Sequence, residues 1–209
     1  MMNRIVILLL CVLFSSTSHA SFPEKFCKAD LNGPDSPSGY LCLPSETVTA
    51  ADFKYTFNGK AGILVPPNTL VFPATVAQYP ILNGLGISGA IVEIPEGGIL
   101  PVHDHDATEI VLVIEGQIDV GILTPRKAFR NKLTPGDVFL FPKGLLHYLI
   151  NSGRGKAVAF AAFSSPNPSF RFLYEELFTN DVPSITISQI SFLDVAQVRK
   201  LKARFNGTG

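Results

Sequence analysis

Short apolar runs separated by turn-forming residues dominate the chain between about residues 53 and 165. The runs read FKYTF, TLVF, GISGAIVEI, ATEIVLVIEG, IDVGIL, DVFLFP, LLHYLIN and AVAFAAF. Such β-rich runs, bounded by Gly, Pro, Asn and Asp, are typical of strands joined by tight turns. Because no helical segments alternate with them, the pattern disfavours a parallel α/β fold. It predicts an all-β sandwich or barrel over residues 51–165.

The hydrophobic period changes near the C-terminus. The stretch SSPNPS interrupts the strand pattern, and FRFLYEELF and SFLDVAQVRKLKARF, which follow it, carry helical spacing. Ser191, followed three residues later by Asp194, predicts a capping box at the start of the last helix. We therefore expect residues 166–209 to form a helical extension whose apolar face packs on the barrel or on a neighbouring subunit.

Residues 1–20 have the three parts of a secretory signal peptide. These are the cationic start MMNR, the apolar run IVILLLCVLF and the small-residue stretch SSTSHA, with cleavage expected after Ala20. A membrane anchor is the alternative, but the apolar run is shorter than the roughly 20 residues that cross a bilayer. The sequence therefore predicts a secreted protein with no membrane span.

Residues 21–50 are rich in turn formers and predict an irregular N-terminal arm. Cys11 would leave with the signal peptide, so Cys27 and Cys42 remain as an even pair in an oxidising compartment. We expect these two residues to form a disulfide that pins the arm. Two free thiols are the alternative, and the spacing of the pair fits no zinc motif.

Composition and charge narrow the possible partners. Lys+Arg and Asp+Glu each total 17, so no basic excess exists to attract nucleic acid or an anionic membrane. Hydrophobic residues make up 46% of the 209 residues, which is enough for the core of one domain. The sequon NGT makes Asn206 a candidate glycosylation site near the C-terminus.

Two of the four histidines lie in the stretch PVHDHDATEI. On a strand, residues i and i+2 point to the same face, so His103 and His105 would project together, and Glu109 could join them across a turn. His147 lies in a second β-rich stretch, and His19 lies in the signal segment. A polar loop, or histidines satisfied by hydrogen bonds, are the alternatives. Three imidazoles and a carboxylate suit Mn, Fe, Zn or Cu, and they leave coordination positions open for water or substrate.

Two spaced motifs contain these residues. The first is G-x5-H-x-H-x3-E-x6-G, from Gly97 to Gly116, and the second is G-x5-P-x-G-x2-H-x3-N, from Gly136 to Asn151. They resemble the two cupin boxes of plant germins and germin-like proteins. The stretches FCKADLNGPDSPSGYLC and FLDVAQVRKLKARF resemble the N-terminal disulfide loop and the C-terminal helix of that family.

The resemblance implies a jelly-roll β-barrel with C-terminal helices, secreted to the apoplast and cell wall as a homohexamer built as a trimer of dimers. It also implies a manganese ion in each subunit, with four matching ligands: His103, His105, Glu109 and His147. By the same match, Asn151 has a structural role, and Gly116 and Gly136 serve turns that need positive φ or close approach.

The first motif departs from the usual family pattern His-Pro-x-Ala-x-Glu. Here HDHDATE lacks the proline and has one residue fewer between His105 and Glu109, which could alter the metal geometry. Glu109 should still open the following strand and face inward. We expect Asp104 and Asp106 to be solvated loop carboxylates, the alternative being that Asp106 tunes or replaces a ligand.

A second departure concerns the substrate. Oxalate-oxidising germins hold oxalate with two asparagines, and the matching positions here are Ala90 and Leu100, which cannot donate a side-chain hydrogen bond. Oxalate oxidase activity is therefore expected to be weak or absent. The resemblance favours superoxide dismutase activity that produces H2O2, with a role in defence or development. The alternative is a non-catalytic wall or receptor-type protein that binds a small aromatic acid such as auxin; a hydrolase activity has no specific residue to support it.

Overall fold

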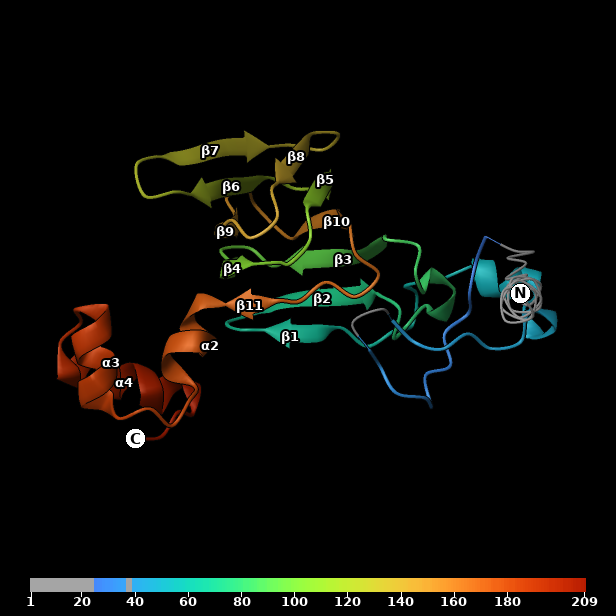
Figure 1. Ribbon diagram of the computed structural model, residues 1–209. Coiled ribbons are helices and arrows are strands. Elements are labelled where there is room, and N and C mark those ends of the chain that lie inside the picture. Colours follow the sequence, from blue (N-terminus) through green and yellow to red (C-terminus); the bar gives the residue numbers. More distant parts are fainter. Residues whose placement is uncertain (1–24, 37–38) are drawn as a thin grey trace, which may run out of the picture.

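The computed structural model describes residues 25–36 and 39–209, and the predicted signal peptide lies outside the described residues. Two antiparallel sheets form the body of the molecule (Figure 1). The first contains, in spatial order, β1 (Ile63–Val65), β2 (Thr69–Ala74), β3 (Ser88–Ile94), β10 (Ala157–Phe163), β5 (Glu109–Glu115) and β8 (Val138–Phe141). The second contains β11 (Arg171–Phe172), β4 (Ile99–Asp104), β9 (His147–Asn151), β6 (Ile118–Leu123) and β7 (Ala128–Leu133).

Alternating burial along the strands builds the core between the two sheets. Along β5, Val111 and Val113 are buried, whereas Ile110, Leu112 and Ile114, which lie before, between and after them, are exposed. The same alternation runs through β10, where alanines at every second position let the sheets approach closely. This period of two places one face of each strand inward. The predicted jelly-roll barrel is confirmed.

The strand prediction was wrong at several places. FKYTF forms no strand, because η2 (Ala50–Phe53) ends within it and the rest runs as irregular chain. There the Tyr55 hydroxyl donates a hydrogen bond to the carbonyl of Pro73. The run-based pattern also missed β1, β7 and β11, whereas the strand expected for PVHDHDATEI is β4, which contains His103 and ends one residue before His105. β7 lacks alternation because all its residues except Leu133 are exposed.

Three helices form the C-terminal extension: α2 (Leu173–Phe178), α3 (Ser184–Ser191) and α4 (Val195–Phe205). They pack around the buried side chains Phe178, Ile187 and Val198. The predicted capping box was misplaced, because Ser191 ends α3 and does not cap α4. Asp194 caps α4 itself, its carboxylate accepting from the amide of Ala196, and Gln197 completes the box. No helix in the described part of the chain is long and apolar enough to cross a membrane.

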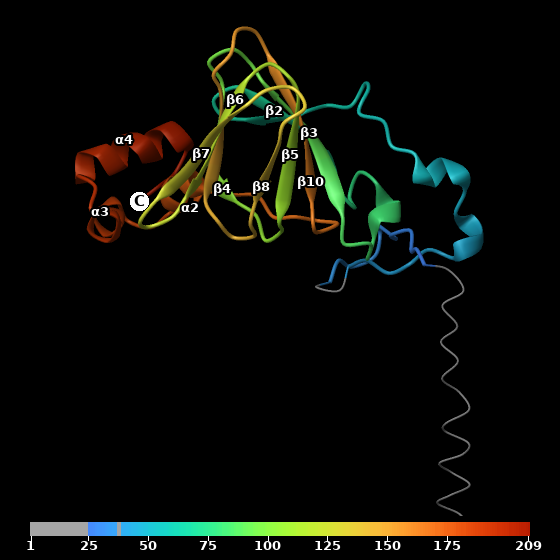
Figure 2. The ribbon, with the colours of Figure 1, turned by 90° about the horizontal axis from the view of Figure 1, so that it is seen from above.

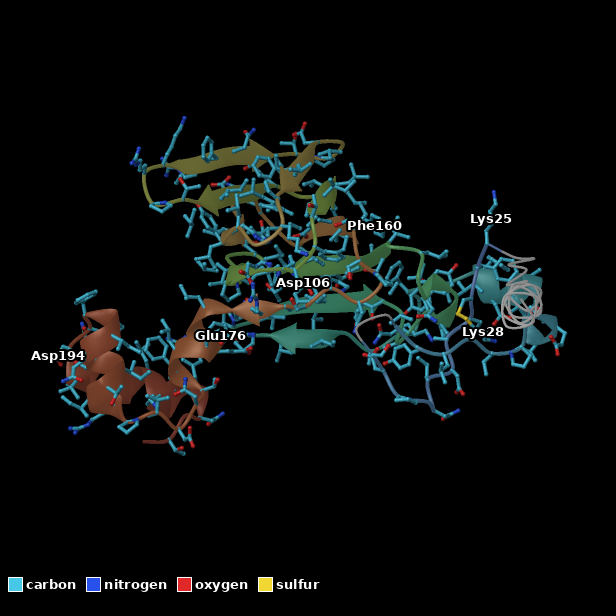
Figure 3. The ribbon with its side chains drawn as sticks, viewed as in Figure 1. Lys25, Lys28, Asp106, Phe160, Glu176 and Asp194 are labelled. Atoms are coloured by element: carbon cyan, nitrogen blue, oxygen red, sulfur yellow. A yellow bond between two sulfur atoms is a disulfide. The ribbon has the colours of Figure 1, made fainter. Side chains whose placement is uncertain are left out.

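The N-terminal arm contains two short 3-10 helices, η1 (Ser45–Thr47) and η2. The structure joins Cys27 to Cys42 in the predicted disulfide, drawn in yellow close to Lys28 in Figure 3. The buried amide of Asn83, just after η3 (Pro80–Leu82), donates to the Tyr40 carbonyl and accepts from the Tyr40 amide. This contact fastens the disulfide loop to the barrel.

The arm and the helical extension lie at opposite ends of the barrel (Figures 1 and 2). Two glycines have the positive φ that the sequence predicted, 79° at Gly116 and 94° at Gly136. A Cβ at Gly116 would lie 2.8 Å from the Cα of Ala157, so this turn also needs close approach of two backbones. Gly116 reverses the chain between β5, which carries Glu109, and β6, and Gly136 reverses it between β7 and β8.

Candidate metal centre

The barrel brings the four predicted residues together inside its core. His103 lies on β4 and faces His147, the first residue of β9, across the sheet. His105 follows the end of β4, and Glu109 is the first residue of β5. All four side chains are at most 3% exposed, and one potential ligand atom from each lies within 4.8 Å of the others. The shortened loop therefore does not separate Glu109 from the histidines.

Each histidine ring is oriented by a hydrogen bond from its Nδ1 atom to a backbone carbonyl. The acceptors are Pro101 for His103 at 2.7 Å, Ser169 for His105 at 2.8 Å and Leu145 for His147 at 2.8 Å. A carbonyl can only accept, so Nδ1 carries the proton in all three rings. The lone pair of each neutral ring is then on Nε2, the atom that a metal would bind.

The Nε2 atoms converge on the Glu109 carboxylate. Its Oε2 atom lies 3.2 Å from Nε2 of His105 and 3.2 Å from Nε2 of His147. In the described chain, buried Nε2 atoms of His103 and His105 have no hydrogen-bond partner. Lone pairs facing a buried carboxylate are satisfied only by a cation or by added protons. The donor set of three imidazoles and one carboxylate therefore fits a divalent transition metal.

The electrostatics of the site favour the protonation states in which His103 and Glu109 can bind a metal. Burial, with added repulsion from His147 and His105, lowers the pKa of His103 to about 3. Burial opposes ionisation of Glu109, but interactions with His105 and His147, whose Nε2 atoms lie 3.2 Å from the carboxylate, outweigh burial and lower the pKa of this carboxyl to about 2. A neutral imidazole and an ionised carboxylate are thus both present near neutral pH.

Aromatic rings that sequence reasoning missed surround the four residues. Phe141 stacks on His147 with 4.3 Å between ring centroids, and Phe170 meets His105 edge-on, also at 4.3 Å. Phe163 and Phe172 contact His105 and His103. Phe163 and Phe141 are the last residues of β10 and β8, next to the site. The sequence offers no signal for Phe170, which lies between β10 and β11. The rings make the site apolar and exclude water from it.

The two acidic neighbours of the histidines are both hydrogen-bonded, but only Asp104 departs from expectation. Asp104 accepts two hydrogen bonds from the Arg171 guanidinium, at 2.8 and 2.7 Å. The Asp106 carboxylate accepts from the amide of Ser169 at 2.8 Å, which contributes most to lowering its pKa. The prediction of a solvated loop carboxylate was therefore wrong for Asp104, which is half-buried on β4, whereas Asp106 is exposed in the loop after β4, as predicted. Asp106 is also outside the four-residue cluster, so the structure does not support its replacing a ligand.

The other predicted positions lie where the sequence placed them. Ala90 and Leu100 are at most 2% exposed within the barrel core, and neither supplies a polar group. The Asn151 amide donates to the carbonyls of Ile94, Pro95 and Gly155. It therefore has the structural role expected from the second motif, closing the end of the barrel.

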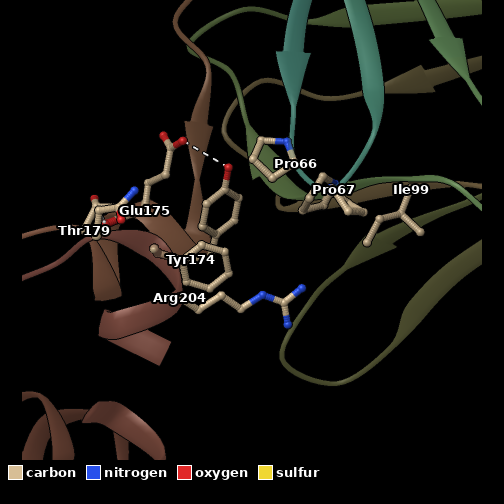
Figure 4. Close-up of a pocket in the computed structure, with 10 residues that line it drawn as sticks. Pro66, Pro67, Ile99, Tyr174, Glu175, Thr179 and Arg204 are labelled. Carbon is tan, nitrogen blue, oxygen red and sulfur yellow. Dashed lines mark hydrogen bonds between the residues drawn. The ribbon is translucent and has the colours of Figure 1, made fainter. Parts of the chain in front are cut away.

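A separate hollow of about 490 Å³ lies between the barrel and the helical extension. Figure 4 shows Pro66 and Pro67 on the barrel side and Tyr174 and Arg204 on the helix side, with Tyr174 donating to Glu175 at 3.1 Å. None of the four clustered residues lines this hollow. It is therefore distinct from the candidate metal centre.

Comparisons with known proteins agree with this architecture. The family model described as Cupin matches residues 56–193. The auxin-binding protein ABP19a of Prunus persica is 43% identical over 199 residues, covering 94% of this chain and 95% of that relative. Germin-like protein subfamily 3 member 3 of Arabidopsis thaliana is 42% identical over 204 residues, covering 94% of each chain.

A solved structure of oxalate oxidase is also similar, with a TM-score of 0.81 and 32% identity over 87% of this chain and 95% of that one. The family model covers most of the chain, and the relatives match it over nearly its full length. The two motifs, the barrel that carries them and these matches lead to one assignment. The chain belongs to the germin-like proteins of the cupin family.

Proposed function

We propose that this chain is a secreted manganese-binding protein of the plant cell wall with superoxide dismutase activity. The observation that carries the proposal is the convergence of buried Nε2 atoms on the Glu109 carboxylate. His103, His105, Glu109 and His147 would hold the ion. A bound manganese ion would supply one-electron chemistry, by which two superoxide radicals and two protons give O2 and H2O2.

The residues of the chain have separate tasks in this proposal. The carbonyls that accept from Nδ1 fix each ring and increase its basicity as a ligand. The carboxylate of Glu109 offsets part of the metal charge, and the rings of Phe141 and Phe170 exclude bulk water. Superoxide is small, and its dismutation does not require a side chain that binds it in a fixed orientation. A buried site of this kind therefore suits superoxide as the reactant.

Oxalate is a poor candidate substrate despite the similarity to oxalate oxidase. A small dianion in a buried site needs hydrogen-bond donors to replace its lost hydration. Ala90 and Leu100 supply none at the positions where the family places asparagines. We therefore expect oxalate turnover to be at least tenfold slower than superoxide turnover, if it is detectable at all.

The second candidate is a binding protein without turnover. It is favoured by the similarity to a relative named auxin-binding and by the aromatic rings around the histidines. An aromatic acid could place its carboxylate on a metal and its ring among these side chains. Saturable binding of such an acid to a protein with no superoxide activity would favour this function over the first.

The first test is the metal content of the secreted protein, measured by mass spectrometry together with superoxide turnover. Wild type is compared with His147→Ala and with Tyr148→Phe, a matched change at the next residue, which points away from the core. Stoichiometric manganese and activity in wild type and Tyr148→Phe, both lost in His147→Ala, support the proposal. Zinc alone, or no transition metal, in wild type contradicts it.

Secretion and modification complete the proposal. Expression with residues 1–20 should deliver a chain that starts at Ser21 to the medium, where Cys27 and Cys42 are oxidised. Asn206 is exposed at the end of α4, so an oligosaccharide could be attached there. Intact-mass measurement before and after glycosidase treatment tests both expectations, and recovery of the protein only inside cells would contradict the first.

We also propose that the chain forms a homo-oligomer, by family analogy a hexamer. An apolar strip on the outer face of the first sheet supports it: Ile110, Leu112, Ile114, Val138 and Leu140 are each at least 39% exposed. The pairs Ile110–Leu140 and Leu112–Val138 are register partners, so the strip is continuous. Continuous exposed apolar area of this kind is typical of surfaces that another chain covers.

A further inference from the structure

His105 is held differently from the other two histidines. The Nδ1 atoms of His103 and His147 donate to carbonyls only two residues earlier in the chain, Pro101 and Leu145. His105 instead donates to Ser169, a residue 64 positions away. The strand β4 ends at Asp104, so the ladder of the sheet does not fix His105. Its orientation therefore depends on whatever fixes Ser169.

Asp106 fixes Ser169 through a reciprocal pair of hydrogen bonds. The Asp106 carboxylate accepts from the Ser169 amide at 2.8 Å, and the Ser169 hydroxyl accepts from the Asp106 amide at 3.3 Å. Asp106 also adjoins His105 in sequence. The loop that carries His105 therefore also holds in place the Ser169 carbonyl that orients the His105 ring. Figure 3 shows Asp106 at the strands of the barrel, away from the helical extension.

The segment that contains Ser169 contacts the candidate site and the motif around it at several residues. We call residues 169–172 the strap. Within it, Phe170 meets the His105 ring at 4.3 Å, Arg171 pairs with Asp104, and Phe172 is the register partner of His103. The strap is thus attached by a carboxylate on each side of His105. Both carboxylates belong to the shortened HDHDATE motif.

We propose that Asp106 and Ser169 are a positioning pair that sets the His105 imidazole for metal binding and compensates for the shortened loop. The inference rests on the proposed metal site. Without the Asp106 carboxylate, Ser169 loses its amide partner and its carbonyl no longer has a fixed position. The His105 ring then has rotational freedom that it must lose again when it binds an ion. Loss of a group that orients a metal ligand typically weakens metal binding about 10- to 100-fold.

The test uses Asp106→Ala, Asp106→Asn and the control Asp137→Ala in the secreted chain. Asp137 accepts from the Thr134 amide and hydroxyl in a similar exposed turn, at the opposite end of β8 from Phe141. The dissociation constants of Mn²⁺ and Co²⁺ are measured by competition with a chelator. We expect an increase of at least about tenfold in Asp106→Ala. Binding should be largely restored in Asp106→Asn, which keeps an acceptor oxygen, and unchanged in Asp137→Ala.

A second readout needs no metal. In metal-free protein, the Nδ1 protons of His103, His105 and His147 should each give a slowly exchanging imidazole resonance in ¹⁵N-resolved NMR spectra. Asp106→Ala should broaden or remove the His105 resonance alone. An unchanged His105 resonance, or equal weakening of metal binding by Asp137→Ala, overturns the inference. If wild type binds neither ion, the proposed metal site fails, and the resonance still decides whether Asp106 positions His105.

Discussion

Asp104 and Arg171 are register partners across β4 and β11, and the guanidinium of Arg171 donates to both carboxylate oxygens of Asp104. The two residues are 67 positions apart in the chain. This ion pair attaches the two-residue strand β11 to the strand that carries His103. A strand so short has few ladder hydrogen bonds, so its side-chain contacts decide how firmly the strap is held.

Arg171→Ala should therefore loosen the strap without unfolding the barrel. Because the pair is partly open to solvent, we expect a small decrease in thermal midpoint at low salt that disappears in about 1 M NaCl. Limited proteolysis should show faster cleavage near the strap. The control is Lys132→Ala on β7, which removes the more open pair with Asp119 on β6. Equal cleavage rates in both variants would contradict the assigned role.

Phe141→Ala should be among the most destabilising single changes in the barrel. Its ring is 1% exposed, belongs to the main core and stacks on His147. Truncation removes this contact and leaves a cavity, for which a loss of about 3–5 kcal/mol in the free energy of unfolding is typical. Urea unfolding of metal-free protein measures it. Phe141→Leu should lower the free energy of unfolding by clearly less. An equal decrease for both variants would argue against tight packing around Phe141.

Lys202→Met tests the helical extension. The ammonium of Lys202 is buried and donates to the carbonyls of Asn180, Val182 and Thr208, which fastens the last residues to the loop before α3. An apolar side chain removes all three hydrogen bonds. Among the described residues, only the Asn180 carbonyl keeps another donor, the Thr208 amide, so we expect a cost on the order of 3 kcal/mol. Hydrogen exchange should accelerate in the extension and not in the barrel. Lys200→Met, at an exposed position of α4, should change hydrogen exchange neither in the extension nor in the barrel.

The stability of the metal-free protein should fall with acidification, first because of His103. Its pKa is about 3 in the fold against an ordinary value of 6.5, so between these values the unfolded chain binds more protons. Stability is therefore fully present above about pH 6.5 and is lost as the pH falls toward 3. Glu109, whose pKa of about 2 lies below its usual 4.5, adds a loss only below pH 4.5.

The window between about pH 6.5 and 4.5 separates these two groups. Urea unfolding of chelator-treated protein across this window should show a positive slope of stability with pH. His103→Gln should have a shallower slope there but keep the loss below pH 4.5. A variant slope equal to that of wild type would mean that His103 is not held neutral by the fold.

Leu112→Asp should disrupt the proposed homo-oligomer. Leu112 lies in the middle of the apolar strip, paired with Val138, and a buried carboxylate without a partner disfavours association. Light scattering after size exclusion should show a smaller species for this variant. Phe129→Asp is the matched control, because Phe129 is similarly exposed but lies on the second sheet. A monomeric wild type, or an unchanged mass for Leu112→Asp, would contradict the assignment of this strip.

The sequence by itself determined the strand-rich barrel and the helical extension, and its resemblance to the germin-like motifs identified the four residues of the candidate metal centre. The reason is that the strand and helix patterns, and the spacing of residues within each motif, are local. Alternation with a period of two selects strands, and the i, i+2 spacing of His103 and His105 lets both side chains face the core at the end of β4. Positive φ at Gly116 and Gly136 likewise follows from the turn chemistry of the nearby chain.

The tertiary structure alone decided how the site is completed. Asp104 and Asp106 have partners in a strap more than 60 residues away, and Phe170 reaches His105 from the same segment. Nothing in the spacing of HDHDATE specifies these contacts, because they depend on the pairing of β11 with β4 in the folded barrel. The charge of an aspartate is visible in a sequence, but whether it faces water or fixes a metal ligand depends on the chain that packs beside it.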